Sequence, residues 1–426
     1  MYVGLDSELC YGDILCAGLY KTHFSYDSDE SINSFFLKHC KNLQDCIGCV
    51  NLMNKSRCIL NVQYSKEEYE RRKSEFDFGS YKKLCEFEKL YNKFALNLPK
   101  RYASIIKSTG ATGNNIMNSK NVKNCFDLYG GIEDSKYLIH ILDMKDSYDI
   151  YGGGAVIDLS YEGVDAGIQS SGQLFSVLTH SCLNTYYTYM CFGSKNLFGC
   201  IGLQGKQYCI LNKQYKKEEY EKLVPKIIEQ MNTMPYKGKK GLIYKYGEFF
   251  PAELSPFAYN ETIAQEYFSK TKEEIIKNGY NYRVPSGHDY KPTIKSENLP
   301  DHIKDVPETI LDEIIACPNN GDEKTQCTKA YRIIKTELDF LKNNNIALPR
   351  YCPNCRHYQR LKQRNPFHLW HRQCQCAGIN SENKKYTNTI EHTHGSEPCP
   401  NEFETPYAPD RPEIIYCEKC YQQEVY

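Results

Sequence analysis

The C-terminal part of the chain, residues 317–420, contains cysteines at spacings typical of metal ligands. Two Cys-x-x-Cys turns occur there, one from Cys352 to Cys355 and one from Cys417 to Cys420. Such a turn lets two thiolates reach one Zn²⁺ at tetrahedral angles, and four ligands complete a closed structural site. The sequence therefore predicts two zinc ions per chain. The predicted ligands are Cys317, Cys327, Cys352 and Cys355 for the first site, and Cys374, Cys399, Cys417 and Cys420 for the second.

The fourth ligand of the second site has competitors. Residues 375–398 form an insertion between two of its ligands, and this insertion contains Cys376, His392 and His394. Each of these side chains binds zinc in proteins, so any of them can replace Cys374. A redox role is an alternative, but a redox Cys-x-x-Cys pair would lie at the strand-to-helix junction of a βαβ unit, which is not apparent here. Inert packing of buried thiols is the remaining alternative.

Cysteines earlier in the chain follow a different rule, since Cys182, Cys191, Cys200 and Cys209 recur every nine residues. Turn-forming Asn, Asp, Ser and Gly recur every dozen or so residues between 119 and 165, as is typical of stacked strands in a parallel β-helix. On such a coil the cysteines point inward as small apolar residues, with a metal or redox role as the alternative. A Greek-key sheet is also an alternative, but Asn-Gly and Asp-Gly hairpin turns are scarce.

An internal repeat connects the two ends of this region. Residues 40–70 align without gaps on residues 191–221, and the cysteines, an asparagine and several tyrosines coincide. Each copy ends in a lysine- and glutamate-rich segment, and in the first copy Ser65 and Glu68 have capping-box spacing for a helix start. The sequence thus predicts two copies of one unit, each a strand array that ends in a helix.

These patterns predict a mainly β protein: a parallel β-helix-like repeat scaffold with inserted helices, followed by a small α+β region resembling a double zinc ribbon or treble clef. Helices are also expected from Ala264 and after Thr271. The predicted domains are a first repeat copy (1–78), a helical insertion (79–100), a second copy with its closing helix (101–232), a linker with helices (233–310), and two zinc modules (311–372 and 373–426).

Composition limits the functional classes. The chain has 426 residues, 41% of them hydrophobic, and its 53 basic and 53 acidic side chains cancel, so no overall field attracts nucleic acid or membrane. The N-terminus lacks the pattern of a signal peptide and no run of 18 apolar residues occurs, so we expect a cytoplasmic protein without a membrane partner. A reducing compartment keeps the 21 cysteines as thiols that are available to metals or to the core.

The chain also resembles a known group. The segments CPNCRHYQRLKQRNPFHLWHRQC, CPNEFETPYAPDRPEIIYCEKC, CILNKQYKKEEYEKLVPKI and GEFFPAELSPFAYNETIAQEYF look like those of an uncharacterised family of bacterial zinc-ribbon proteins. The resemblance covers most of residues 40–426 and implies zinc and this architecture, but no reaction. It favours Cys374 over Cys376 as a ligand. The repeat region of such proteins extends further upstream, so we expect a truncated member, because residues 5–11 already look like a coil.

One stretch suggests a nucleic-acid partner, because no acidic residue lies between Phe340 and Ser381. Basic side chains there can follow a phosphate backbone while Trp370 stacks on a base. The alternative is that these arginines pair with the acidic tail and that Trp370 packs between the two zinc modules. The candidate nucleic-acid contacts are Arg356, Arg360, Lys362, Arg364, Trp370 and Arg372.

Three functions follow as hypotheses. The leading one is a non-catalytic, zinc-binding scaffold that binds a macromolecule. The sequence specifies neither this partner nor the oligomeric state of the chain. The second assigns nucleic acid as that macromolecule. The third is a carbohydrate-active β-helix enzyme, which needs two carboxylates facing one cleft; aspartate is also the usual turn residue of such coils. The aspartates concerned are Asp127, Asp134, Asp143, Asp146, Asp149 and Asp158.

Overall fold

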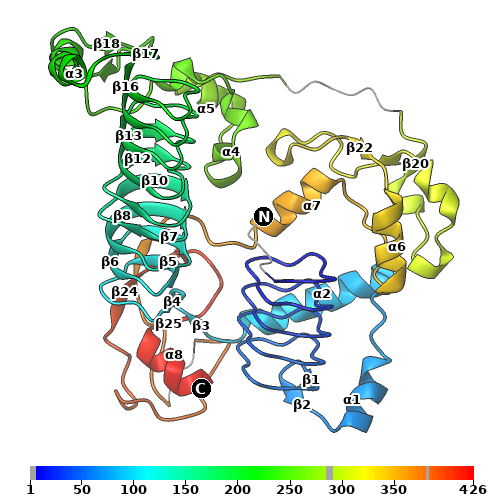
Figure 1. Cartoon of the computed structure of the whole chain (residues 1–426). Helices are drawn as coiled ribbons and strands as arrows, with labels where there is room; N and C mark the ends of the chain where they lie inside the picture. Colours follow the sequence, from blue (N-terminus) through cyan, green and yellow to red (C-terminus); the bar gives the residue numbers. More distant parts are fainter. Residues whose placement is uncertain (1–5, 285–290, 380–382) are drawn as a thin grey trace.

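The computed structural model describes residues 6–284, 291–379 and 383–426, and it contains two separate β-solenoids (Figure 1). In the first, single parallel bridges join every third residue to the one twelve positions later, from Glu8 with Tyr20 to Ile47 with Ile59. Nearly every third residue has a positive φ, so each coil turns a corner after every short side. Asn, Asp and Gly tolerate this conformation best, which explains why they recur along the coils.

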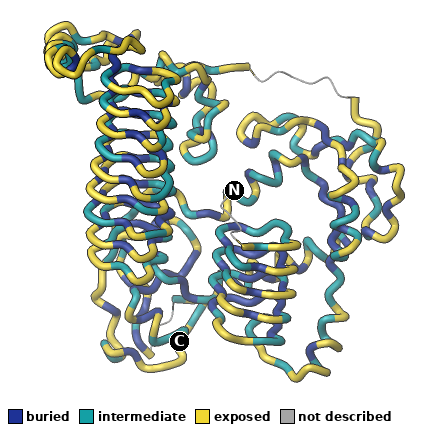
Figure 2. Tube along the Cα trace, in the orientation of Figure 1, coloured by how far each residue is buried: buried dark blue, intermediate teal, exposed yellow. Residues whose placement is uncertain are grey.

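Small polar side chains fill the interior of the first solenoid. Ser25, Ser28, Ser31 and Ser34 are at most 1% exposed. The Ser28 hydroxyl accepts a hydrogen bond from the Cys40 N–H, twelve residues later, at 3.2 Å. Further along the column cysteine and leucine side chains take the place of serine. Buried residues accordingly line the inside of both columns (Figure 2).

The second solenoid runs from residue 105 to residue 210 and pairs its strands in parallel. Its interior contains isoleucine and leucine in the first coils and cysteine in the last ones. The strands are β4 (Ile105–Ile106), β5 (Gly113–Met117), β6 (Lys120–Lys123), β7 (Cys125–Leu128), β8 (Glu133–Ile141), β9 (Met144–Lys145), β10 (Tyr148–Gly153), β11 (Ile157–Asp158), β12 (Tyr161–Val164), β13 (Ser170–Val177), β14 (Leu183–Tyr186), β15 (Lys195–Phe198) and β16 (Gln207–Ile210). The predicted solenoid fold is confirmed.

The nine-residue spacing of the late cysteines is shorter than one coil. Paired residues in these coils lie twelve positions apart, as in Leu183 with Lys195, so a step of nine falls one corner short of a full turn. Cys182, Cys191 and Cys200 each direct the thiol toward the backbone oxygen of the next cysteine in the series, at 3.4 to 3.6 Å. All of them are buried, so they fill the interior diagonally from coil to coil.

Both solenoids end in the same closing unit, as the repeat predicted. The first closes with the antiparallel pair β1 (Cys58–Ile59) and β2 (Val62–Gln63), then α1 (Lys66–Lys73); the second closes with β16, β17 (Lys213–Gln214) and α3 (Lys217–Thr233). In the first unit the Asn61 side chain bonds the N–H and C=O of Val50, at 2.8 and 2.9 Å. Asn212 bonds Ile201 in the same way, at 2.8 Å for both bonds. Each side-chain amide thus makes the hydrogen bonds that a further coil would make and satisfies a backbone N–H and C=O of the last coil.

The segment between the solenoids is helical, as predicted. Helix α2 (Tyr81–Leu96) begins at the cap residue Ser80 and places Phe87 and Tyr91 against Phe36 of the first solenoid, while Leu90 on the same helix is 51% exposed. Strand β3 (Lys100–Arg101) follows and leads into the second solenoid.

The region after α3 contains little regular structure. Its elements are β18 (Tyr236–Lys237), β19 (Ile243–Tyr244), α4 (Ala264–Tyr267), α5 (Lys272–Lys277) and β20 (Ile294–Lys295). The helices predicted from Ala264 and after Thr271 are thus α4 and α5, and the capping box of Thr271 and Glu274 is present. Residues 299–310 share one core with the first cysteine module, so in packing they belong with that module.

The C-terminal region folds back onto the solenoids. Its elements are β21 (Ile315–Ala316), β22 (Ala330–Tyr331), α6 (Lys335–Asn343), α7 (Pro353–Leu361), β23 (Trp370–Gln373), β24 (Glu402–Thr405), β25 (Ile415–Tyr416) and α8 (Glu418–Val425). Strand β25 pairs in parallel with β3, so the tail lies beside the chain that joins the two solenoids (Figure 1). Among the described residues, the structure contains no helix long and apolar enough to cross a membrane.

Candidate metal centres

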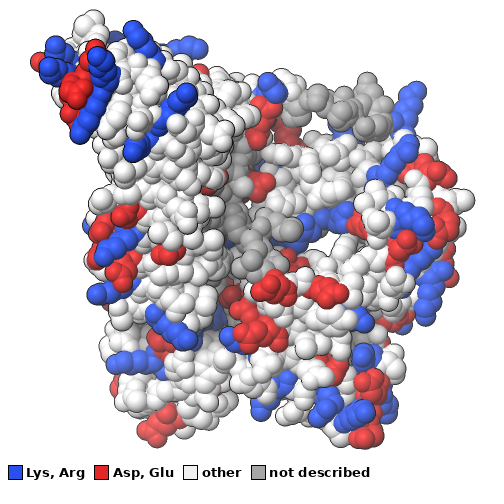
Figure 3. Space-filling view, in the orientation of Figure 1, with Lys and Arg blue, Asp and Glu red and all other residues white. Residues whose placement is uncertain are grey.

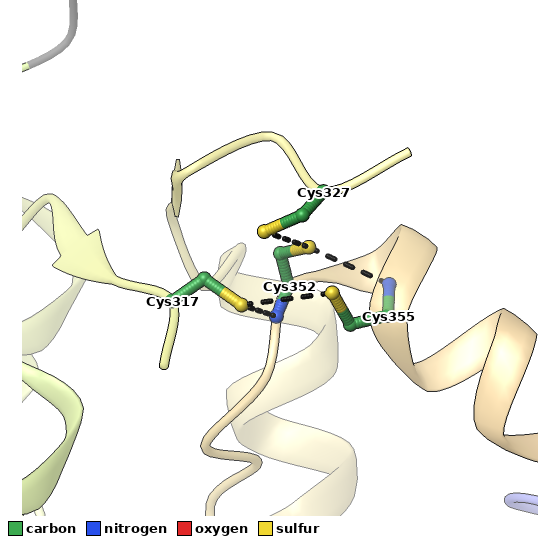
Figure 4. A group of neighbouring side chains, drawn as sticks. All are labelled: Cys317, Cys327, Cys352 and Cys355. Atoms are coloured by element: carbon green, nitrogen blue, oxygen red, sulfur yellow. Dashed lines mark hydrogen bonds between the residues drawn. The ribbon is translucent and has the colours of Figure 1, made fainter. Parts of the chain in front are cut away.

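The four cysteines predicted for the first site come together at the start of α7. Cys317 follows β21 directly, and Cys327 follows a short turn that ends at Gln326, whose φ is 47°. Cys352 is the N-cap residue of α7 and Cys355 lies in its first turn. Figure 4 shows the four sulfur atoms pointing toward one another. Three of the four residues are buried and Cys327 is partly exposed.

Distances in the first group fit a tetrahedral metal. With metal–sulfur bonds of about 2.3 Å, sulfur atoms at the corners of a tetrahedron lie about 3.8 Å apart. The Cys317 and Cys355 sulfurs are 3.8 Å apart, and the Cys327 and Cys352 sulfurs 4.0 Å. The Asn319 amide and the Cys352 N–H donate to sulfurs of the group, at 3.2 and 3.4 Å, as expected around thiolates.

The second predicted group forms in the same manner at α8. Cys417 is the N-cap residue of α8 and Cys420 lies one turn later, while Cys374 follows β23 and Cys399 precedes β24. The Cys399 and Cys417 sulfurs lie 3.8 Å apart, again the tetrahedral spacing. The ligand atoms of all four residues lie within 4.8 Å of one another, and all four residues are buried. The structure thus brings both predicted sets of ligands together and includes Cys374 in the second.

Hydrogen bonds lower the pKa of one cysteine in each group. Burial acts to raise the pKa of Cys352, but the N–H of Cys355 and donors from Thr328 outweigh it and lower this pKa to about 6. In the second group, hydrogen bonds from Cys374 and Cys420 hold the pKa of Cys417 well below its usual range, whereas its neighbours raise the pKa of Cys420. Protons are therefore shared between sulfurs, and a divalent cation can replace them.

A third group was not predicted as a separate site. Cys376, His392 and His394 gather with Cys420, and their ligand atoms also lie within 4.8 Å of one another. From the sequence, these three residues were expected only as substitutes for Cys374. No periodic signal marks them, although a cysteine and two histidines within one short insertion are themselves a metal-binding composition. Within the described ranges, the three groups include no cysteine from the solenoids, and all 21 cysteines are free of disulfides.

Three arginines of the basic stretch form contacts within the protein. Arg356 is paired with Glu337 at 2.6 Å, and its guanidinium also donates to the Tyr11 hydroxyl at 2.8 Å. Arg364 is 9% exposed and forms an ion pair with Asp127 of the second solenoid. Arg372 donates to backbone oxygens of the tail.

The other candidate contacts of this stretch differ in how far their side chains are exposed. Arg360 is partly buried, and burial lowers its pKa. Trp370 is partly buried on β23 and packs edge-on against His368 at 4.4 Å, whereas Lys362 is exposed. Nucleic-acid contact by these residues stays a prediction, with Lys362 the most accessible charge among them.

The aspartates of the enzyme hypothesis are mainly corner residues. Asp127, Asp134, Asp146 and Asp149 have φ between 47° and 57°, the conformation of the solenoid corners. Asp127 is 1% exposed and bound to His140 and Arg364. A surface pocket of about 320 Å³ beside β7 and β8 is lined by one carboxylate, that of Glu404. Since the hypothesis needs two carboxylates at one cleft, this pocket does not supply the pair.

No protein-family model matches the chain, and neither a curated protein nor a solved structure matches it. The resemblance to bacterial zinc-ribbon proteins therefore stays a prediction. The general architecture that it implies, a β-solenoid combined with cysteine clusters that can hold metal ions, is present in the structure.

Proposed function

We propose that this chain is a non-catalytic scaffold protein that binds structural zinc through two four-cysteine sites and presents its solenoids to a macromolecule. The observation that carries the proposal is the pair of compact sulfur groups at the starts of α7 and α8. Sulfur donors at tetrahedral spacing are the typical environment of structural zinc. Because protein sulfurs occupy all four positions, neither site leaves a position for substrate, as catalysis would require.

Zinc at these sites would hold the tail against both solenoids. The core around the first group includes Tyr11, Phe24 and Phe35 from the first solenoid. In the second group, Cys417 directly follows β25, which pairs with β3 in the chain between the solenoids. A bound ion in each module contributes free energy of order 10 kcal/mol to folding, enough to fix these contacts.

The surface of the second solenoid supports a macromolecular partner. Apolar side chains stand out from successive coils, among them Val156, Leu159 and Ile201, which are 58 to 62% exposed. Figure 3 shows that uncharged side chains dominate a long part of this column. Apolar side chains that are exposed over several coils mark interaction sites when they form a contiguous patch. Nucleic acid has less support, because Arg356 and Arg364 are engaged within the protein.

Metal analysis of matched variants tests the zinc sites. We expect the purified chain to contain zinc, and Cys352→Ala to lose one ion, because this residue supplies one of four ligands. The control Cys191→Ala removes an equally buried cysteine from the solenoid interior and should leave the zinc content unchanged. Protein that contains no zinc, or a Cys352→Ala variant with the full zinc content, would contradict the proposal.

A salt titration tests the nucleic-acid alternative. Binding of single-stranded DNA or RNA through phosphates weakens steeply as salt rises, and loss of one contact reduces the slope. If affinity falls with salt and Lys362→Glu weakens it while Lys136→Glu on the solenoid does not, nucleic acid is the partner. If no binding occurs, the partner belongs to another class.

A further inference from the structure

The insertion between Cys374 and Cys399 contains a set of donors that the two proposed sites do not use. The Cys376 sulfur lies 2.9 Å from Nδ1 of His392 and 3.5 Å from Nε2 of His394. The same nitrogen of His394 lies 3.3 Å from the sulfur of Cys420. Two sulfurs and two ring nitrogens therefore converge on one point, and these are the donors of a Cys₂His₂ zinc site.

The second nitrogen of each histidine is held by an acceptor. Nε2 of His392 lies 3.0 Å from a carboxylate oxygen of Glu424, and both side chains are fully buried. Nδ1 of His394 lies 2.8 Å from the backbone oxygen of Glu397. Each acceptor fixes the proton on the ring nitrogen that faces it, away from the cysteines. The other ring nitrogen, which faces the sulfur of Cys376, keeps a lone pair for a metal ion. Metal-binding histidines are almost always oriented in this way.

The sulfur of Cys376 is surrounded by donors, as a ligating thiolate is. The Asn388 amide donates to it at 2.8 Å and the Gly378 N–H at 3.4 Å. Cys376 is 1% exposed, so a negative charge there needs a counter-ion as well as these hydrogen bonds. A cation at the centre of the group satisfies both the sulfur and the two inward lone pairs.

Cys420 belongs to this group and to the second four-cysteine group at the same time. A thiolate sulfur has several lone pairs and can bind two metal ions at once. Cys374, Cys376, Cys399, Cys417 and Cys420 together carry five negative charges when ionised, and two divalent ions reduce this to a single net charge. One ion alone would leave three uncompensated charges, or protonated sulfurs, in a buried cluster.

We propose that Cys376, His392 and His394 bind a third divalent ion, and that Cys420 bridges it to the ion of the second site, forming a two-metal cluster at the start of α8. The proposal rests on zinc binding by the second site. It also explains how residues 383–399, which contain no helix or strand, are held against α8, because the ligands and Glu424 fasten this segment to that helix.

Zinc stoichiometry of the purified chain provides the first test. We expect three ions per wild-type chain and two in the His392→Ala, His394→Ala double variant, with His394→Cys retaining all three because thiolate replaces imidazole. The control His368→Ala changes an exposed histidine outside the groups and should retain three ions. Two ions in the wild type and no loss in the double variant would overturn the third site and leave the proposed function intact. Protein without zinc would overturn both.

Cadmium substitution tests the bridge itself. With ¹¹³Cd in all sites, we expect three NMR signals, two of which show cadmium–cadmium coupling through the shared sulfur of Cys420. Cys420→Ser should remove this coupling and reduce the metal content by more than Cys327→Ser, which affects one ion only. Three cadmium signals without coupling would overturn the bridge, and equal loss in the two serine variants would do the same.

Discussion

Lys100 offers a direct test of the packing between the tail and the chain that joins the solenoids. It lies on β3 beside β25 and is 2% exposed. Its ammonium nitrogen has no hydrogen-bond partner among the described residues. Burial, reinforced by the nearby charge of Lys38, lowers the pKa of Lys100 from 10.5 to about 7. A buried amine of this kind opposes folding whenever it must carry a proton.

The expected magnitude follows from the two pKa values. Below pH 7 the Lys100 side chain is protonated in both the folded and the unfolded chain. The lowered pKa then reduces the free energy of unfolding by about 5 kcal/mol, since one pKa unit corresponds to about 1.4 kcal/mol. Between pH 7 and about 10 the unfolded chain binds more protons, so stability rises with pH. The cost should therefore fall to about 2 kcal/mol at pH 9.

Substitution Lys100→Met keeps the buried alkyl chain and removes the titrating group. We expect the variant to be more stable than the wild type, and the difference to shrink by about 2.5 kcal/mol between pH 6 and pH 9. Urea unfolding of both proteins at several pH values measures this difference, in which the titration of the cysteines cancels. Lys136→Met changes an exposed lysine and serves as the control. A stability difference that does not change with pH would refute the reasoning.

Three further predictions follow from the same structure. Asp127→Ala removes the carboxylate that pairs with the buried Arg364 guanidinium and should destabilise the protein by about 3–5 kcal/mol, which urea unfolding measures. A second change, Arg364→Met, should recover most of this loss, and no recovery would contradict the importance of the ion pair. Burial alone would raise the pKa of Asp127, but His140 and Arg364 hold it below its ordinary value, so this contribution is present above about pH 4 and disappears as pH falls through the folded pKa. Asn212→Ala removes both bonds to the last coil and should cost about 1–3 kcal/mol and speed proteolysis after residue 201, while Asn184→Ala, at an exposed corner, should not. Zinc removal by a chelator should release the β25–β3 pairing and increase amide exchange there, with little change inside the second solenoid; uniform exchange would contradict a local role for the metal.

Local sequence patterns were sufficient for the elements whose geometry is set within a few residues. A Cys-x-x-Cys turn at a helix start orients both sulfurs by backbone geometry alone, so Cys352 and Cys355 were recognisable without tertiary information. Recurring corner residues likewise predicted the solenoid, because each coil repeats the same local bonds. The matching of residues 40–70 with 191–221 predicted the two closing units, in which Asn61 and Asn212 make equivalent contacts.

Contacts between distant segments had no such local signal. Arg364 and Asp127 are 237 positions apart, and nothing in a basic stretch indicates which acidic residue it meets. The recurrence of turn residues every dozen or so positions matches the twelve-residue pairing of the coils, whereas the nine-residue cysteine spacing is one corner less than a full turn.

The sequence by itself thus determined the ligand pairs, the solenoid repeat and its closing units, because chain connectivity and backbone conformation set all three. Only the tertiary structure decided that Cys374 belongs to the second group while Cys376, His392 and His394 form another around Cys420. The physical reason is that the part of the insertion that the structure describes after residue 382 contains no helix or strand. Its path is fixed by contacts with α8, such as the one between His392 and Glu424, which lie 32 positions apart and become neighbours only when the chain folds.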